Sequence, residues 1–83
     1  MNYEILFDKP AQKFILKQQQ EQRKRLLFAI SKLPDIGDIK AMKGCPNLFR
    51  LRVGDYRVIY TVEPKQSLIR ILNIGNRGDI YKQ

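Results

Sequence analysis

Residues 49–60 constrain the fold more than any other part of the chain. Their side chains alternate at period two on both sides of a Gly54–Asp55 pair. This pattern predicts a β-hairpin with a two-residue turn, in which Gly54 supplies the positive φ that such a turn needs. One face of the hairpin is then apolar and carries Phe49, Leu51, Val53, Tyr56, Val58 and Tyr60. The opposite face carries Arg50, Arg52 and Arg57, with Ile59 among them.

The register of this hairpin places two cations side by side. Arg52 lies directly opposite Arg57, and like charges so placed destabilise a sheet by about 0.2–1 kcal/mol. Arginine binds phosphate through a rigid fork of donors. A single arginine on a solvated strand is usually only solubilising, whereas three on one face, two of them neighbours, favour an anion site. We therefore expect this face to hold an anion, with a polyphosphate as the obvious candidate.

The N-terminal half predicts one strand and two helices. Residues 2–7 alternate as a strand, and residues 9–18 form a helix whose apolar positions recur at helical spacing. Residues 17–25 are all polar, which fits either a turn or the solvated middle of one long helix; we favour two helices in an antiparallel hairpin. The second apolar face consists of Leu26, Leu27, Ile30 and Leu33. Pro34 ends the second helix.

The C-terminal half completes an α+β fold. We expect a loop over residues 35–44, a turn at 63–66 and a largely apolar strand over 67–74 that is central in the sheet. The predicted architecture is a two-helix hairpin packed on one face of a small, mostly antiparallel four-stranded sheet, in the order β-α-α-β-β-β. The arginine face is left open. With 83 residues, the chain is expected to form one domain spanning 1–83.

The charge balance points to an anionic partner. Lys and Arg number 16 against 8 acidic residues, which gives a net charge of +8 without any histidine. Such a balance favours nucleic acid, an acidic protein or a membrane surface as a partner. The simpler alternative is a soluble protein that is merely basic.

Several chemistries have no support in the sequence. Without histidine, a His-based triad and an ordinary zinc site are excluded, and no glycine-rich phosphate loop is present. We expect no metal and no cofactor. Cys45 is the single cysteine, which suits a reducing compartment, and we interpret it as a small core or loop-edge thiol. There is neither a signal-peptide pattern nor an apolar run of about 20 residues, so the protein is expected to be cytoplasmic.

Further basic and aromatic residues flank the hairpin. Arg77 and Tyr81 follow the last strand, and a chain leaving a sheet there can fold back over the open face. Lys40 and Lys43 lie in the segment that leads into the hairpin and could line the same groove. A basic face with an interleaved aromatic ring suits single-stranded nucleic acid. The same cluster could stabilise the charge that develops on phosphorus during RNA cleavage, in which the 2′-hydroxyl of the RNA serves as nucleophile.

With these residues in place, the chain resembles the RelE/ParE toxin superfamily of toxin–antitoxin systems, on the RelE side, over essentially its whole length. The resemblance is carried by Lys43-Gly44, the segment 49–60, Ile74-Gly75-Asn76-Arg77 and Asp79-Ile80-Tyr81. It implies a toxin that enters the ribosomal A site and cuts mRNA between codon nucleotides. It also implies a cognate RelB-like antitoxin that wraps the toxin, with operator DNA bound only indirectly, through the antitoxin.

The resemblance also implies roles for individual residues. Arg57 and Arg77 hold the scissile phosphate, Arg52 neutralises charge beside it, and Tyr81 stacks a base or moves a proton. Arg50 binds RNA or the ribosome, and we expect Lys40 and Lys43 to do the same because of their place beside the hairpin and not because of the resemblance. Two departures from the family pattern matter, because arginines stand at 50 and 52 where lysines are best known, and Asn76 stands where many relatives carry histidine or lysine. Arginine is a poor general base, since it effectively never loses its proton.

Two other functions remain open at this stage. A ParE-like inhibitor of DNA gyrase shares the fold without the nuclease activity. A non-catalytic module would use the basic face only to bind RNA or an acidic protein, in a salt-dependent way. A membrane-surface role is disfavoured, because the basic residues lie on a strand face and not beside an apolar helical stripe.

Overall fold

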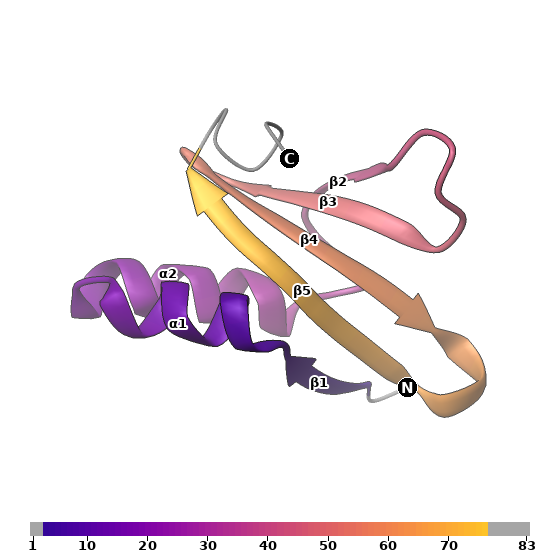
Figure 1. The fold of residues 1–83 in the computed structure, drawn as a ribbon, viewed down its shortest axis with the longest axis horizontal. Helices are drawn as coiled ribbons and strands as arrows, with labels where there is room; N and C mark the ends of the chain where they lie inside the picture. The colour runs from indigo at the N-terminus through magenta and orange to yellow at the C-terminus, as the bar shows by residue number, and fades with distance from the viewer. Residues whose placement is uncertain (1–2, 77–83) are drawn as a thin grey trace.

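The part of the chain that the structure describes forms a mixed five-stranded sheet with two helices on one of its faces (Figure 1). The computed structural model describes residues 3–76. The elements follow the chain in the order β1 (Glu4–Phe7), α1 (Lys9–Lys17), α2 (Gln20–Ser31), β2 (Asp38–Ala41), β3 (Leu48–Val53), β4 (Tyr56–Glu63), a 3-10 turn (Pro64–Gln66) and β5 (Leu68–Asn76). The strand order in the sheet is β1-β5-β4-β3-β2. β1 runs parallel to β5, and the other neighbours are antiparallel.

The α+β class and the helix-on-sheet arrangement are confirmed, but the predicted count of four strands is wrong. Residues 35–44 were expected to form a loop, whereas Asp38–Ala41 form β2 and pair with β3 at the edge of the sheet. This strand is four residues long and has a single large apolar side chain, Ile39, so its alternation is too short to identify in the sequence. Short, charged strands are typical of exposed sheet edges.

The two-helix interpretation of the polar stretch is confirmed. α1 ends at Lys17, and Gln18 and Gln19 both adopt extended backbone before α2 begins. The guanidinium of Arg23 donates hydrogen bonds to the carbonyl oxygens of Ile15 (3.4 Å), Leu16 (3.4 Å) and Gln18 (3.1 Å). The last carbonyls of a helix have no partner within the helix. Arg23 therefore terminates α1 in the role that a glycine or a proline commonly serves.

The core lies between the helices and the covered face of the sheet. Its buried side chains come from both helices, from the turn after α2, and from β3, β4 and β5: Ala11, Ile15, Leu26, Ile30, Leu33, Leu51, Val53, Val58, Tyr60, Ile69, Ile71 and Ile74. Leu27 was expected on the buried face of the second helix, but it is 40% exposed. The strand β5, predicted as central, lies inside the sheet between β1 and β4.

The hairpin of β3 and β4 has the predicted register. Val53 pairs with Tyr56, Arg52 with Arg57 and Leu51 with Val58. Gly54 has a φ of +58°, as the two-residue turn requires. The hairpin therefore turns its apolar side chains toward the helices and its arginines toward the open face.

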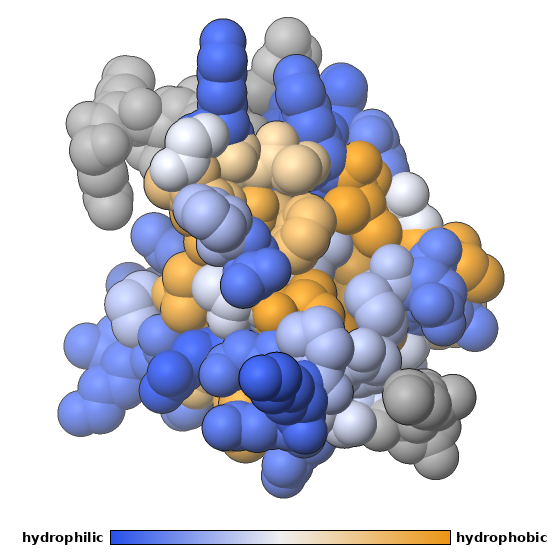
Figure 2. Space-filling model, turned by 90° about the vertical axis from the view of Figure 1, so that its right-hand side faces the viewer, coloured by the Kyte–Doolittle hydropathy of each residue, from blue (hydrophilic) through white to orange (hydrophobic). Residues whose placement is uncertain are grey.

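On the side of the molecule where β2 connects to β3, apolar side chains gather in the middle and hydrophilic ones surround them (Figure 2). A cavity of about 230 Å³ lies among Pro34, Ile39, Asn47, Phe49, Tyr60, Val62 and Pro64. Within residues 3–76, no helix is long and apolar enough to cross a membrane.

Candidate nucleic-acid interface

Four cations form two adjacent rows on the open face of the sheet. In the first row, Asp38 of β2, Arg52 of β3 and Arg57 of β4 are successive cross-strand neighbours. In the second row, Lys40 of β2 lies opposite Arg50 of β3. Cross-strand partners lie on the same face, about 4.5–5.5 Å apart at Cβ. The structure thus brings together four of the predicted site residues, and one carboxylate, that of Asp38, lies among them.

Arg57 is buried although it lies on the open face. Its side chain is 5% exposed, and its Nη1 donates to the carbonyl oxygens of Tyr56 (3.1 Å) and Gly54 (3.5 Å). Among residues 3–76, no carboxylate forms an ion pair with it. Buried charges are normally paired, because removal from water penalises the charged form. A buried guanidinium oriented by carbonyl groups and flanked by a second arginine is an arrangement that favours an anionic ligand.

Arg50 is also largely covered. Its side chain is 17% exposed, and its Nη2 contacts the Oδ1 of Asp38 at 3.4 Å. Its Nε is buried, and within residues 3–76 it has no hydrogen-bond partner. Lys40 and Arg52, by contrast, are exposed. The face therefore combines two covered guanidinium groups with two cations that extend into solvent.

The structure adds two residues that the sequence analysis did not assign to this region. Asp38 was placed in a loop, and its position beside Arg50 depends on the unforeseen strand β2. Arg25 lies at the end of the polar stretch 17–25, and its guanidinium lies against the hairpin turn. A Cβ added to Gly54 would lie 2.8 Å from Nη2 of Arg25. Only tertiary packing brings α2 to this turn, so no local pattern could have indicated the contact.

The remaining predicted residues are not brought into the rows by the described structure. Lys43 is exposed in the connection between β2 and β3. Cys45 lies in the same connection as an exposed free thiol, so the loop-edge interpretation is confirmed. Arg77 and Tyr81 lie outside the described residues, and their placement over the open face stays a prediction.

One tyrosine can be excluded as a proton carrier at this face. Burial raises the pKa of Tyr60 from 10.0 to about 12. Its ring stacks on Phe49 on the covered face of the sheet, with centroids 5.6 Å apart. Tyr60 is therefore a core residue, separated from the arginines by the sheet itself.

Comparisons with known proteins agree with this architecture. Residues 5–81 match the family described as the ParE toxin of type II toxin-antitoxin system, parDE. None of the curated proteins matches the chain at a significant level. Among solved structures, the archaeal RelE–RelB complex from Pyrococcus horikoshii OT3 is 30% identical with a TM-score of 0.77, covering 95% of this chain and 99% of that chain.

Two further structures extend the comparison. The RelB–RelE antitoxin–toxin complex from Methanococcus jannaschii is 30% identical with a TM-score of 0.74, covering 92% of this chain and 94% of that chain. The isolated E. coli RelE toxin is 23% identical with a TM-score of 0.72, covering 95% and 90%, and shows the likeness of fold alone. Taken with the family match, these similarities show that the chain belongs to the RelE/ParE toxin superfamily and has the structure of a RelE-like toxin.

Proposed function

We propose that this protein is a ribosome-dependent endoribonuclease that cleaves mRNA in the ribosomal A site and so inhibits translation. The observation that carries the proposal is the buried guanidinium of Arg57, which faces Arg52 and has no carboxylate partner among residues 3–76. Such a pair costs stability unless an anion neutralises it. The phosphodiester of a single-stranded RNA supplies that anion.

Four residues share the work of the cleavage step. The 2′-hydroxyl of the RNA attacks the adjacent phosphorus, the bond to the 5′-oxygen breaks, and the proton lost by the 2′-hydroxyl is balanced by one gained by the 5′-oxygen. Arg57 and Arg77 hold the scissile phosphate, and Arg52 stabilises the charge that develops on it. Arginine cannot accept the proton, so the phenol of Tyr81 is the proton carrier or the stacking ring.

Positioning of the RNA falls to the cations beside this centre. Arg50 and Lys40, which are cross-strand neighbours, bind the backbone next to the scissile bond. Lys43 extends the basic surface along the connection that leads into β3. Neutralising several phosphates makes binding strongly dependent on salt.

A purified translation reaction with added protein, followed by primer extension on the mRNA, tests the proposal. We expect discrete cuts at A-site codons that require ribosomes, and we expect Arg57→Ala to abolish them. Arg70→Ala is the matched control, because Arg70 is an exposed strand arginine paired with Asp8 at 3.0 Å and lies outside the rows. Intact mRNA under active translation, or full cleavage by soluble Arg57→Ala and Arg77→Ala variants, would contradict the assignment.

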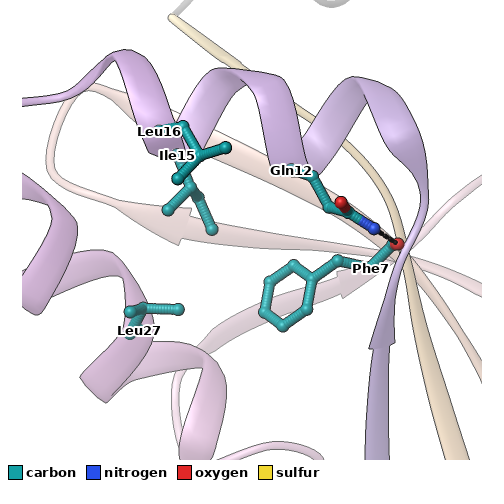
Figure 3. Close-up of a pocket in the computed structure, with 5 residues that line it drawn as sticks. All are labelled: Phe7, Gln12, Ile15, Leu16 and Leu27. Carbon is teal, nitrogen blue, oxygen red and sulfur yellow. Dashed lines mark hydrogen bonds between the residues drawn. The ribbon is translucent and has the colours of Figure 1, made fainter.

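The helical side offers a surface for a protein partner. A groove of about 200 Å³ lies between the two helices and β1, lined by Phe7, Gln12, Ile15, Leu16 and Leu27 (Figure 3). Leu16 is 70% exposed and Phe28 on α2 is 66% exposed. α1 carries three lysines and no acidic residue. An amphipathic segment with acidic flanks fits this surface, and we assign it to a cognate RelB-like antitoxin, through which any operator DNA would be bound.

This partner assignment has its own test. Two of the solved structures that match this chain, both at 30% identity, are complexes of RelE with RelB. Leu16→Asp should leave growth inhibition by the toxin intact while weakening its neutralisation by the protein encoded beside it. Gln66→Asp, on the exposed 3-10 turn, changes the charge by the same one unit away from the groove. Equal neutralisation of both variants would place the antitoxin elsewhere.

Gyrase inhibition is the second candidate, because the matching family is named for the ParE toxin. A gyrase inhibitor would produce DNA breaks and an SOS response while the mRNA stayed uncut. A gyrase cleavage assay run beside the translation reaction separates the two activities. The cationic rows favour RNA cleavage, since they supply charge stabilisation at a phosphodiester.

A further inference from the structure

The ion pair between Asp38 and Arg50 is loose. The distance between Nη2 of Arg50 and Oδ1 of Asp38 is 3.4 Å, and the aspartate side chain is 60% exposed. The arginine side chain is 17% exposed, so the cation is held by its surroundings while the carboxylate is free to turn into solvent. An exposed ion pair of this kind contributes little to stability. Its presence among the cations of the open face therefore suggests another role.

The donors of Arg50 are only half used by this pair. A guanidinium presents Nε and Nη2 side by side, and this fork matches the two oxygens of a carboxylate or a phosphate. Asp38 contacts Nη2, whereas Nε is buried and has no partner within the described residues. Buried donors without partners are rare in native proteins and call for an explanation.

The charges around the fork are strongly unbalanced. Lys40 lies directly opposite Arg50, and Arg52 lies two residues along the same strand and opposite Asp38. Among residues 3–76, one carboxylate therefore faces three cations at this end of the sheet. A phosphate that binds to Arg50 would take the place of the Asp38 carboxylate and supply the negative charge instead.

We propose that Asp38 is a positioning residue that occupies half of a phosphate-binding fork on Arg50 until RNA displaces it. In the free protein, Asp38 keeps the guanidinium oriented along the sheet. When RNA binds, the aspartate turns outward and the guanidinium shifts so that the buried Nε is uncovered, and phosphate oxygens accept hydrogen bonds from both Nε and Nη2. The inference rests on the proposed function, since it assigns RNA to this face. It makes Asp38 an internal competitor that weakens binding to phosphates unable to engage both donors.

Binding of a short, fluorescently labelled single-stranded RNA tests the inference. The RNA carries 2′-O-methyl groups so that it cannot be cleaved, and affinity is read by fluorescence anisotropy at low salt. Asp38→Asn keeps an oxygen that can accept from Nη2 but removes the competing charge. Asp35→Asn is the matched control, because it removes one negative charge from an exposed position three residues away. We expect Asp38→Asn to bind RNA about two- to fivefold more tightly than Asp35→Asn, as the strength of an exposed pair implies.

The same comparison in an Arg50→Ala background shows whether the effect passes through this fork. We expect Arg50→Ala to weaken RNA binding and to remove the difference between the two asparagine variants. Arg50→Lys provides a second background that retains the charge without the fork. The two asparagine variants are compared in this background if the alanine variant does not fold. In the lysine background the advantage of Asp38→Asn should be smaller than with arginine, because an ammonium group can still pair with Asp38 but offers a phosphate no planar fork of donors.

The outcomes separate this inference from the proposed function. If Arg50→Ala weakens RNA binding but Asp38→Asn binds no better than Asp35→Asn, the role of Asp38 is wrong and the RNA-binding face stands. If the advantage of Asp38→Asn persists without Arg50, the aspartate acts through general charge, and the fork is wrong. If neither Arg50 variant changes RNA binding, both the fork and the assignment of RNA to this row fail.

Discussion

The burial of Tyr60 predicts a loss of stability in alkaline solution. Its side chain is 1% exposed and stacks on Phe49, and burial raises its pKa from 10.0 to about 12. The folded protein therefore keeps the phenolic proton in a range of pH where the unfolded chain has already lost it. Stability from this group is complete below pH 10 and is lost as the pH rises through about 12.

The size of the effect follows from the shift. One pKa unit corresponds to about 1.4 kcal/mol, so a shift of about two units corresponds to roughly 2.7 kcal/mol in total. At pH 11, midway between the two pKa values, about 1.4 kcal/mol of that stability is already lost. Because small domains have unfolding free energies of about 5–15 kcal/mol, the change is large enough to measure.

Urea unfolding from about pH 8 to about pH 11 measures this loss, with Tyr60→Phe as the reference. Other groups titrate in this range, but they do so in both proteins, so the difference between the two pH profiles isolates Tyr60. We expect wild type to lose about 1.4 kcal/mol more than the variant by pH 11. If the free energy of unfolding falls by the same amount with pH in both proteins, the argument is refuted. Tyr60→Phe should also retain mRNA cleavage, because the ring lies on the covered face of the sheet.

Three further predictions concern the framework of the site. Gly54→Ala should lower the free energy of unfolding by about 1–2 kcal/mol in urea denaturation, because its φ is +58° and the new Cβ would meet Arg25. Arg23→Ala should speed amide exchange in the last turn of α1, since it removes the side-chain donor to two carbonyls of that turn, those of Ile15 and Leu16, whereas Arg70→Ala should not. Leu26→Ala, at a fully buried position, should cost about 2–5 kcal/mol, whereas Leu27→Ala next to it should cost much less, and thermal melts of the pair test the orientation of α2.

The elements that could be predicted from the sequence are those whose signal is local. The hairpin was predictable to the residue, because alternation and turn chemistry both lie within residues 49–60 and agree on one register. The break between the helices was harder to predict. The residue whose side chain satisfies the carbonyls at the end of α1 is Arg23, which lies five residues after Gln18. β2 was missed because an edge strand of four residues has too few positions to show a period.

The site was predictable in its residue types but not in its environment. The like-charge pair of Arg52 and Arg57 followed from the register alone. The burial of Arg57 did not, because an arginine on an open sheet face is expected to extend into solvent. Asp38 reaches the cations only through the pairing of β2 with β3, so its role depends on a contact that no local pattern encodes.

The hairpin turn belongs both to the fold and to the candidate site, which explains why residues 49–60 predicted both. Gly54 adopts the positive φ that the turn requires, and its carbonyl oxygen accepts a hydrogen bond from Arg57. The conformation that closes the hairpin thus also orients the buried guanidinium. The strands then fix the other cations, because residues two apart on one strand lie about 6.7 Å from each other and neighbouring strands lie about 4.8 Å apart. The two covered guanidinium groups, those of Arg50 and Arg57, therefore lose little entropy when they bind an anion, and such preorganised charge is what electrostatic stabilisation of a cleavage transition state requires.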